Sequence, residues 1–253
     1  MDIQKTILKT LDNMGWDIFT NQMLVSELSL SSKQISEALF KMASNKDVYL
    51  LEKGKYCRHH YRDEFVIANF LVKNGGVAYW SAMHYHGITE QIPNVIFVQT
   101  TMPKANKIIF GLRYHFVKVK AEKLLGFKTE GFGNHQFKIT DVEKTMVDCF
   151  DMPQYGGEYA ELIKAFNHAQ LSAQKLVKYC KAINNISVTK RLAYLTELLQ
   201  KPKMDYFIRY AQSVKNKKYN LFEVGGLNTG KTNNRWNLIL NMDEDEIFEI
   251  ANS

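Results

Sequence analysis

Residues 31–44 read SSKQISEALFKMAS, and this stretch decides the fold expected for the N-terminal part of the chain. Ser31 and Gln34 stand at S-x-x-Q spacing, at which the serine hydroxyl accepts from the Gln34 amide and the glutamine side chain reaches back to Ser31. Four apolar residues repeat at helical spacing, namely Ile35, Ala38, Leu39 and Met42. The stretch therefore predicts a capped helix with one buried stripe. The face expected in solvent consists of Ser32, Lys33, Ser36, Glu37, Phe40 and Lys41.

The flanking segments give this helix its context. Apolar spacing predicts a first helix over residues 3–11 that ends at Gly15, and Thr20 is placed to cap a second helix. Two strand-like runs around Gly54 predict a basic hairpin over residues 48–57. This order is typical of a winged helix-turn-helix, a fold that commonly lays its recognition helix in the DNA major groove. A three-helix protein–protein module with a solvated basic edge is the alternative.

The DNA-binding interpretation assigns contacts to three places. Residues at the start of a recognition helix reach deepest into the groove, so base-edge contacts are assigned to Lys33, Gln34 and Ser36, with Ser32 and Lys41 on the same face. Phosphate contacts are assigned to the start of the second helix and to the hairpin, through Thr20, Asn21, Gln22, Lys53, Lys55 and Arg58. Additional phosphate contacts are expected from Lys215, Lys217 and Lys218.

Composition bounds the class of protein. The chain has 253 residues, 45% of them hydrophobic, which is enough for a substantial core. A net charge of +7 favours polyanionic partners. Three widely separated cysteines without a C-x-x-C motif argue against a disulfide framework and suit a reducing compartment. With no apolar run of about 18 residues and no signal peptide, we expect a cytoplasmic protein without a membrane partner.

The remaining sequence predicts a larger second domain. The polar stretch 58–63 marks the boundary, giving domains of residues 1–62 and 63–253. Two helices are expected over 65–72 and 77–85, the first stopped by a Gly-Gly pair. Strand-like runs follow at 95–98, 108–110, 114–119 and 136–139, and their close spacing indicates an antiparallel sheet with one face in water.

Helical periodicity then dominates for about seventy residues. Thr140 and Glu143 have the spacing of a second capping box, and five helices are expected between there and residue 211. Two short strands are expected at 221–224 and 236–240, before an acidic tail over 243–249. The predicted fold class is thus α+β, with an N-terminal winged helix-turn-helix and a larger mixed domain. That domain combines a small antiparallel sheet with a bundle-like helical part.

Several segments resemble one known family. They are residues 76–91 (GVAYWSAMHYHGITEQ), 140–153 (TDVEKTMVDCFDMP), 155–157 (YGG) and 190–195 (KRLAYL). In this order, and together with the N-terminal pattern, they resemble the AbiEi-type antitoxins, the transcriptional regulators of bacterial abortive-infection (type IV) toxin-antitoxin systems.

The resemblance implies a non-enzymatic protein that uses no cofactor. It implies a repressor that binds double-stranded DNA and autoregulates its own operon. The DNA-binding interpretation adds that two protomers, as a homodimer, occupy inverted repeats in the promoter. The resemblance further implies an antitoxin, active in phage defence, that opposes a nucleotidyltransferase-like toxin without forming a stable complex with it.

Three other patterns resemble nucleotide-binding, metal-binding or catalytic motifs, but each lacks a feature that such a motif requires. Residues 225–232 match the P-loop spacing G-x-x-x-x-G-K-[ST], but a strand-like run follows where a P-loop needs a helix. His84 and His86 lack the i, i+4 spacing of a helical metal pair, so no metal site is expected. Glu143, Lys144 and Asp148 are expected to form an ordinary surface network.

Two other functions remain open. A metal-dependent DNA nuclease of a defence system would need clustered carboxylates, and Asp141, Glu143 and Lys144 lie together in the sequence. Their position at a helix start, where acids serve capping, speaks against this role. A protein-interaction scaffold that does not bind DNA is the third possibility.

Overall fold

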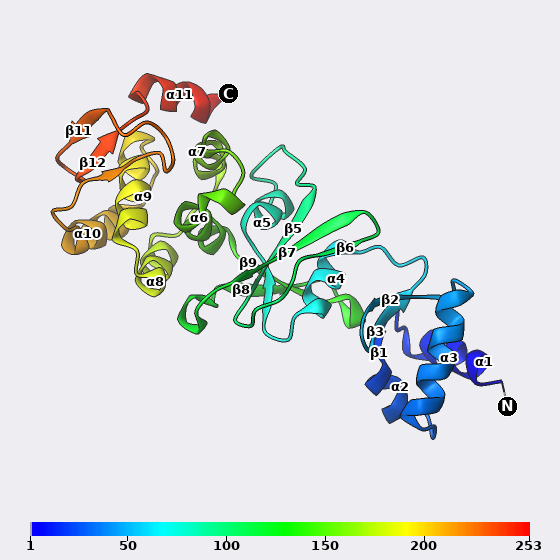
Figure 1. Cartoon of the computed structure of the whole chain (residues 1–253). Helices are drawn as coiled ribbons and strands as arrows, with labels where there is room; N and C mark the ends of the chain where they lie inside the picture. The colour runs from blue at the N-terminus through cyan, green and yellow to red at the C-terminus, as the bar shows by residue number, and fades with distance from the viewer. Residues whose placement is uncertain (1) are drawn as a thin grey trace.

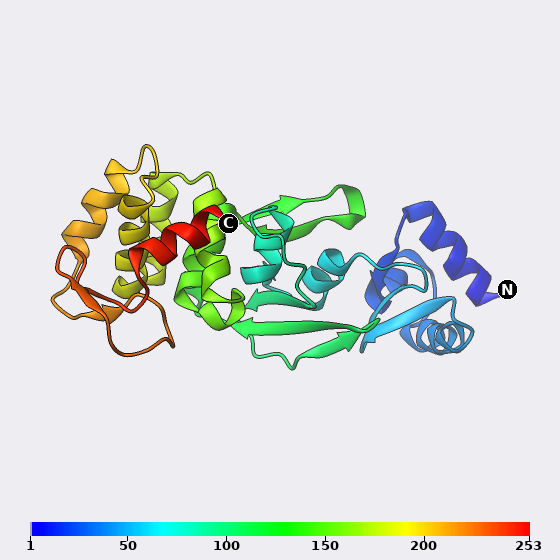
Figure 2. The same cartoon turned by 90° about the horizontal axis from the view of Figure 1, so that it is seen from above.

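The chain forms an elongated mixed α+β structure. The computed structural model describes residues 2–253. In two perpendicular views, a head formed by residues 2–58 lies at one end, a six-stranded sheet lies in the middle, and most of the helices gather at the other end (Figures 1 and 2). Within residues 2–253, no helix combines the length and the apolar character needed to cross a membrane.

The head contains three helices and a three-stranded antiparallel sheet in the order β1-β3-β2. In chain order its elements are α1 (Ile3–Met14), β1 (Ile18–Thr20), α2 (Asn21–Glu27), α3 (Ser32–Ser44), β2 (Val48–Glu52) and β3 (Lys55–Arg58). The predicted apolar stripe of α3 is confirmed, because Ile35, Ala38, Leu39 and Met42 are all buried. Strand β1 is absent from the sequence-based expectation; it pairs with β3.

The central sheet corrects the predicted antiparallel arrangement. Its strands are β4 (Gly75–Val77), β5 (Val95–Thr100), β6 (Lys107–Ile109), β7 (Leu112–Lys118), β8 (Phe127–Glu130) and β9 (Phe137–Thr140). They lie in the order β6-β7-β5-β4-β9-β8, and the pairs β5–β7 and β4–β9 are parallel. The sheet is therefore mixed.

Both faces of this sheet are covered, so the expected wet face is also wrong. Ile96 and Val98 of β5 pack into the cluster that contains helix α4 (Glu64–Leu71), whereas Phe97 packs into the cluster of the helical part. Successive strand residues point to opposite faces. Strand β5 consequently has neighbours on both sides and is almost entirely buried.

The Gly-Gly pair predicted to stop a helix instead forms strand β4. A Cβ atom on Gly75 would lie 1.9 Å from the Gln99 carbonyl oxygen, and one on Gly76 would lie 2.5 Å from the Lys138 carbonyl oxygen. Gly75 also has a φ of +148°. Only glycine fits where backbones approach this closely. Helix α5 (Tyr79–Tyr85) accordingly begins two residues later than predicted.

The five helices predicted for the next part of the chain are present. They are α6 (Val142–Asp151), α7 (Tyr159–His168), α8 (Ala173–Ile183), α9 (Ile186–Leu198) and α10 (Asp205–Val214). The expected capping box of Thr140 is wrong: Thr140 ends strand β9, and Asp141 caps α6 by accepting from the Lys144 amide at 2.9 Å.

A small sheet and a last helix complete the chain. The strands are β10 (Asn220–Leu221), β11 (Lys231–Asn233) and β12 (Leu238–Leu240), in the order β10-β12-β11. The acidic tail forms helix α11 (Glu244–Asn252), which lies beside α7 (Figure 1). Its buried residues Ile247 and Ala251 belong to the core of the helical part.

Head and body, the latter being residues 64–253, share part of their core. Ile18, Leu51 and Cys57 of the head belong to the same buried cluster as the α4 side of the sheet. Polar contacts reinforce the junction, because Lys107 Nζ donates to the Leu51 carbonyl at 2.7 Å and Lys55 Nζ donates to the Phe70 carbonyl at 2.7 Å. The two parts are therefore docked through both apolar and charged contacts.

Candidate nucleic-acid interface

The outer face of α3 is a free polar surface at the end of the molecule. Ser31 begins the helix by accepting from the Gln34 amide at 3.3 Å, which fixes the first turn. The side chains at 32, 33, 36, 37, 40 and 41 are all exposed, as the periodicity predicts. Figure 1 shows α3 on the outside of the head, away from the sheet and the other helices of the body. A nucleic-acid duplex could approach this face without a change in the rest of the fold.

The second helix is tied to this face by one side-chain contact. Asn21, at the start of α2, donates through Nδ2 to Ser36 Oγ at 2.6 Å. Asn21 Oδ1 is buried without a hydrogen-bond partner. Thr20 accepts from the Met23 amide at 3.1 Å and so serves as the helix cap, whereas Gln22 is exposed. Of the three predicted phosphate contacts at this helix start, the structure leaves the Gln22 side chain free.

Gln34 uses half of its amide group within the protein. Its Oε1 atom accepts from the Ser31 amide at 3.0 Å and from Ser31 Oγ at 2.8 Å. The Nε2 group has no hydrogen-bond partner within residues 2–253 and stands on the exposed face. An amide nitrogen donates only. The structure thus leaves Gln34 able to donate to an acceptor outside the protein.

The three predicted hairpin cations have different surroundings. Lys53 is exposed at the turn between β2 and β3. Lys55 pairs with Glu52 at 3.0 Å in addition to its bond to Phe70, and its side chain is 25% exposed. Arg58 pairs with Asp12 and, at 3.5 Å, with Asp17, and its side chain is 16% exposed. Lys53 is therefore the hairpin cation that points to solvent, while the other two hold the fold together.

Glu52 organises the charged part of the junction. It accepts from Lys104 of the body and from Lys55, and Lys107 lies 3.8 Å away. Burial by itself would raise the pKa of Glu52, but the hydrogen bonds from Lys104 and Lys55 outweigh it and lower that pKa below its ordinary value of 4.5. The hairpin is consequently fastened to the body by a carboxylate that stays ionised.

The more distant predicted cations do not join this surface. Lys215, Lys217 and Lys218 follow α10, at the opposite end of the molecule from α3 (Figure 1). Lys215 donates to the Arg235 carbonyl at 2.6 Å. This second basic region is therefore separate from the exposed face of α3 (Figure 1).

Two residues near α3 add to the surface and were not chosen as contacts from the sequence. Phe40 lies on the exposed face and is 76% exposed. Lys46 follows the helix, is exposed and has a φ of +63°. An aromatic residue on an otherwise polar helix face was a usable signal for Phe40, since such a side chain can pack on a thymine methyl group. Lys46 was visible in the sequence as one of the cations beside the basic hairpin, but it was not assigned a contact.

The other candidate chemistry of the sequence is structural. Glu143, Lys144 and Asp148 are buried, which corrects the expected surface network. Lys144 pairs with Asp148, and Gln99 Nε2 donates to the same carboxylate at 2.8 Å. The residues after the glycine-rich stretch 225–230 form strand β11, so that segment does not open a helix as a P-loop does. Among the described residues, no three histidine, cysteine or acidic side chains are placed to share a metal ion.

Comparison with known proteins supports the fold. The chain matches no protein-family model and no curated protein. A solved structure, the crystal structure of the RV2827C protein from Mycobacterium tuberculosis, is similar with a TM-score of 0.64, over 98% of this chain and 94% of that chain. The two sequences are 13% identical, so the likeness concerns the fold alone. It spans the head, the sheet and the helical part together.

Proposed function

We propose that this protein is a DNA-binding transcriptional repressor whose head acts as a winged helix-turn-helix, and that it is the antitoxin of a type IV toxin-antitoxin system. The observation that carries the repressor role is the outer face of α3. This face is polar and exposed, carries Lys33 and Lys41, and lies in the same head as the exposed Lys53 of the hairpin turn. The antitoxin role rests on the sequence resemblance to AbiEi-type antitoxins.

In this proposal α3 enters the major groove of a promoter half-site. Gln34 Nε2 donates to a base acceptor such as guanine O6 or N7, because its oxygen is held by Ser31. Lys33 lies one residue earlier on the exposed face, and Ser36 is oriented by Asn21. Lys53 contacts an adjacent phosphate. Two protomers would occupy an inverted repeat, and the cytoplasmic location inferred from the sequence is part of the proposal.

The first experiment is a binding titration of the full chain against its own upstream DNA and against a scrambled duplex. We expect tight binding to the upstream DNA that weakens steeply with salt, since lysine–phosphate contacts release counterions. The variant Lys33→Glu/Lys53→Glu should lose this binding. The matched control Lys178→Glu/Lys181→Glu reverses two exposed charges on α8, far from α3, and should bind as wild type does.

The same titration separates the alternatives. Repeated with magnesium and analysed on a denaturing gel, it would show cleaved strands if the protein were a nuclease. Equal affinity for both duplexes would remove sequence reading from the proposal. Absence of binding to either duplex would favour the interaction scaffold.

Neutralisation of a toxin needs its own test in the full chain. Deleting residues 1–62 would remove Ile18, Leu51 and Cys57 from the buried cluster that the head shares with the body, and so could destabilise the body. Charge reversal is therefore the better tool. Lys33→Glu/Lys53→Glu should abolish repression of the promoter while growth rescue from the nucleotidyltransferase-like toxin persists. Loss of rescue with an unchanged melting temperature would place antitoxicity in the head.

A further inference from the structure

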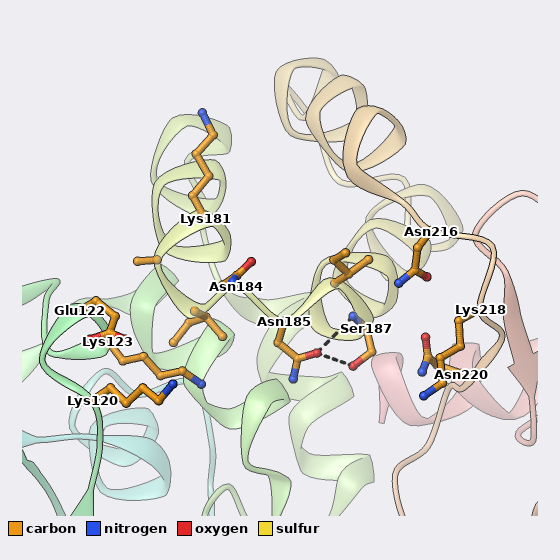
Figure 3. Close-up of a pocket in the computed structure, with 13 residues that line it drawn as sticks. Lys120, Glu122, Lys123, Lys181, Asn184, Asn185, Ser187, Asn216, Lys218 and Asn220 are labelled. Carbon is orange, nitrogen blue, oxygen red and sulfur yellow. Dashed lines mark hydrogen bonds between the residues drawn. The ribbon is translucent and has the colours of Figure 1, made fainter.

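A polar pocket lies in the helical part, far from α3. It has a volume of about 850 Å³ and is formed by the turn between α8 and α9, by η1 (Ala121–Lys123) and by residues 216–220. Sites for small molecules commonly measure roughly 300 to 1,000 Å³. Figure 3 shows Lys120 and Lys123 reaching in from one side and Lys218 and Asn220 on the other, with Asn184, Asn185 and Ser187 between them. The pocket is thus large enough for a nucleotide and is lined by converging polar groups.

The charge of the pocket is positive. Lys120, Lys123, Lys181 and Lys218 line it, with Glu122 as the acidic member of the lining. Lys123 is already paired with Asp151 at 2.7 Å. Lys120 and Lys218 form no ion pair within residues 2–253 and are exposed. Two lysines on opposite walls are therefore available to an anionic ligand.

A buried lysine behind the wall adds to this field. Lys190 is fully buried and donates through Nζ to the Lys218 carbonyl at 2.6 Å and to the Asn237 carbonyl at 3.2 Å. Burial first, and then the neighbouring charges of Arg191, Lys218 and Lys215, lower the pKa of Lys190 to about 8. The carboxylates at this place are Glu122 and Asp151, and Asp151 is already bound by Lys123 and Asn185. The positive groups remain in excess, and a bound anion would reduce that excess.

The neutral groups of the pocket supply directional hydrogen bonds. Asn185 caps α9, a helix of thirteen residues, by accepting from the Ser187 amide at 3.2 Å, and its Nδ2 donates to Asp151 at 2.8 Å, so both ends of this amide serve the fold. Its neighbour Asn184 ends α8 in the left-handed conformation and is exposed. Asn216 and Asn220 face the α8–α9 turn across the pocket (Figure 3). Asparagine amides both donate and accept, which is what the edge of a nucleobase requires.

We propose that this pocket binds a nucleoside triphosphate. The phosphates lie between Lys120 and Lys218 and close to the start of α9, where a helix favours negative charge. The base or ribose is read by the side-chain amides of Asn184 and Asn220, which line the pocket. The pocket is separate from the glycine-rich stretch 225–230, and the proposal does not rest on the repressor function, because it uses no residue of the head.

Calorimetric titration of the full chain with ATP, GTP and inorganic tripolyphosphate tests this. We expect binding of at least one nucleoside triphosphate, weakened at least about tenfold in Lys120→Ala/Lys218→Ala, since each charge-assisted contact to phosphate contributes strongly. The Lys218 carbonyl that holds Lys190 is unaffected by this change. The control Lys33→Ala/Lys41→Ala removes the same charge from α3 and should leave triphosphate binding unchanged.

A third variant tests whether the nucleoside is read. Asn184→Gly keeps the left-handed backbone and removes the amide, so it should weaken the nucleoside triphosphate and leave tripolyphosphate unaffected. Tripolyphosphate binding as tightly as the nucleotides would overturn the nucleoside assignment. Absence of triphosphate binding, or binding unchanged in Lys120→Ala/Lys218→Ala, would overturn the site. Loss of duplex DNA binding in that variant, with no triphosphate bound, would replace the proposal by a phosphodiester surface.

Discussion

Gln34 shows how one side chain can serve the fold and a ligand together. Its oxygen completes the cap of α3, and its nitrogen, without a partner in residues 2–253, is the atom that the proposed function assigns to DNA. We predict that Gln34→Glu keeps the cap, because a carboxylate accepts the same two bonds, so the melting temperature stays close to wild type. Binding to the upstream DNA should fall by about tenfold or more, since the donor is lost and a negative charge enters the groove. Equal losses on upstream and scrambled DNA would show that Gln34 reads no base.

The two hairpin lysines should behave differently. Lys53→Ala is expected to reduce the slope of log affinity against log salt by about 0.9, the value for one lost phosphate contact. Lys55→Ala should leave that slope unchanged and lower the free energy of unfolding, because Lys55 holds Glu52 and the Phe70 carbonyl. Salt titrations and urea denaturation of both variants check this. A reduced slope in Lys55→Ala alone would reverse the assignment.

For single residues, the sequence predicts contacts between side chains that are close in the chain and misses contacts between distant ones. Ser31 and Gln34 are three residues apart, so their mutual bonds are legible from spacing. Lys55 bonds to the Phe70 carbonyl, 15 residues away, and Arg58 pairs with Asp12, 46 residues away. No pattern in the hairpin sequence predicts these remote partners. The two residues therefore resemble free cations in the sequence and are structural in the fold.

Helix α6 is the element in which a charge is most deeply enclosed. Lys144 and Asp148 are one turn apart and both are buried. Lys144→Met should lower the free energy of unfolding by about 3 kcal/mol or more, because it leaves a buried carboxylate without its partner. Lys144→Met/Asp148→Asn removes both charges and keeps an acceptor for Gln99, so it should recover most of the loss. Chemical denaturation measures both; a double variant as unstable as the single one would contradict the argument.

Elements differ in how well the sequence predicts them. Helix α3 was predicted closely because its cap and its stripe lie within fourteen residues of sequence. Strands β1 and β4 are three residues long and are defined by partners elsewhere in the chain. Strand β4 depends on the absence of side chains at Gly75 and Gly76, which lets the neighbouring backbones approach. Without knowledge of the neighbouring strands, a Gly-Gly pair predicts the end of a helix instead. Parallel pairing of β5 with β7 likewise has no local signature.

For the molecule as a whole, the junction between head and body should respond to acid. The pKa of Glu52 is lower in the folded protein than its ordinary value of 4.5, so its stabilising contribution is complete above that pH and is lost as the pH falls through the lower folded value. Glu52→Gln should lower the free energy of unfolding by about 1 kcal/mol at pH 7. The difference from wild type should shrink below pH 4.5, which denaturation across a pH series would show. A difference that persists in acid would assign the effect to packing.

Prediction of the candidate site also depends on scale. The exposed face of α3 follows from the sequence alone, whereas the pocket behind η1 does not. Lys120, Asn184 and Lys218 are up to about a hundred residues apart, and only the folded helical part brings them around one cavity. The positive charge of residues 215–218 is evident from the sequence. Their position at the far end of the molecule from α3 is evident only from the fold.

The docking of the head has a consequence for the phasing of promoter sites. Because the head is fastened to the body, the position of the major groove that α3 occupies would determine the side of the duplex from which the long body projects. DNA turns once in about 10.5 base pairs. Under the proposed function, five extra base pairs between two half-sites would send one body to the opposite side of the duplex, and a full turn would restore the alignment. The number of base pairs between the half-sites would then determine whether the two bodies lie on the same side of the duplex and can contact each other.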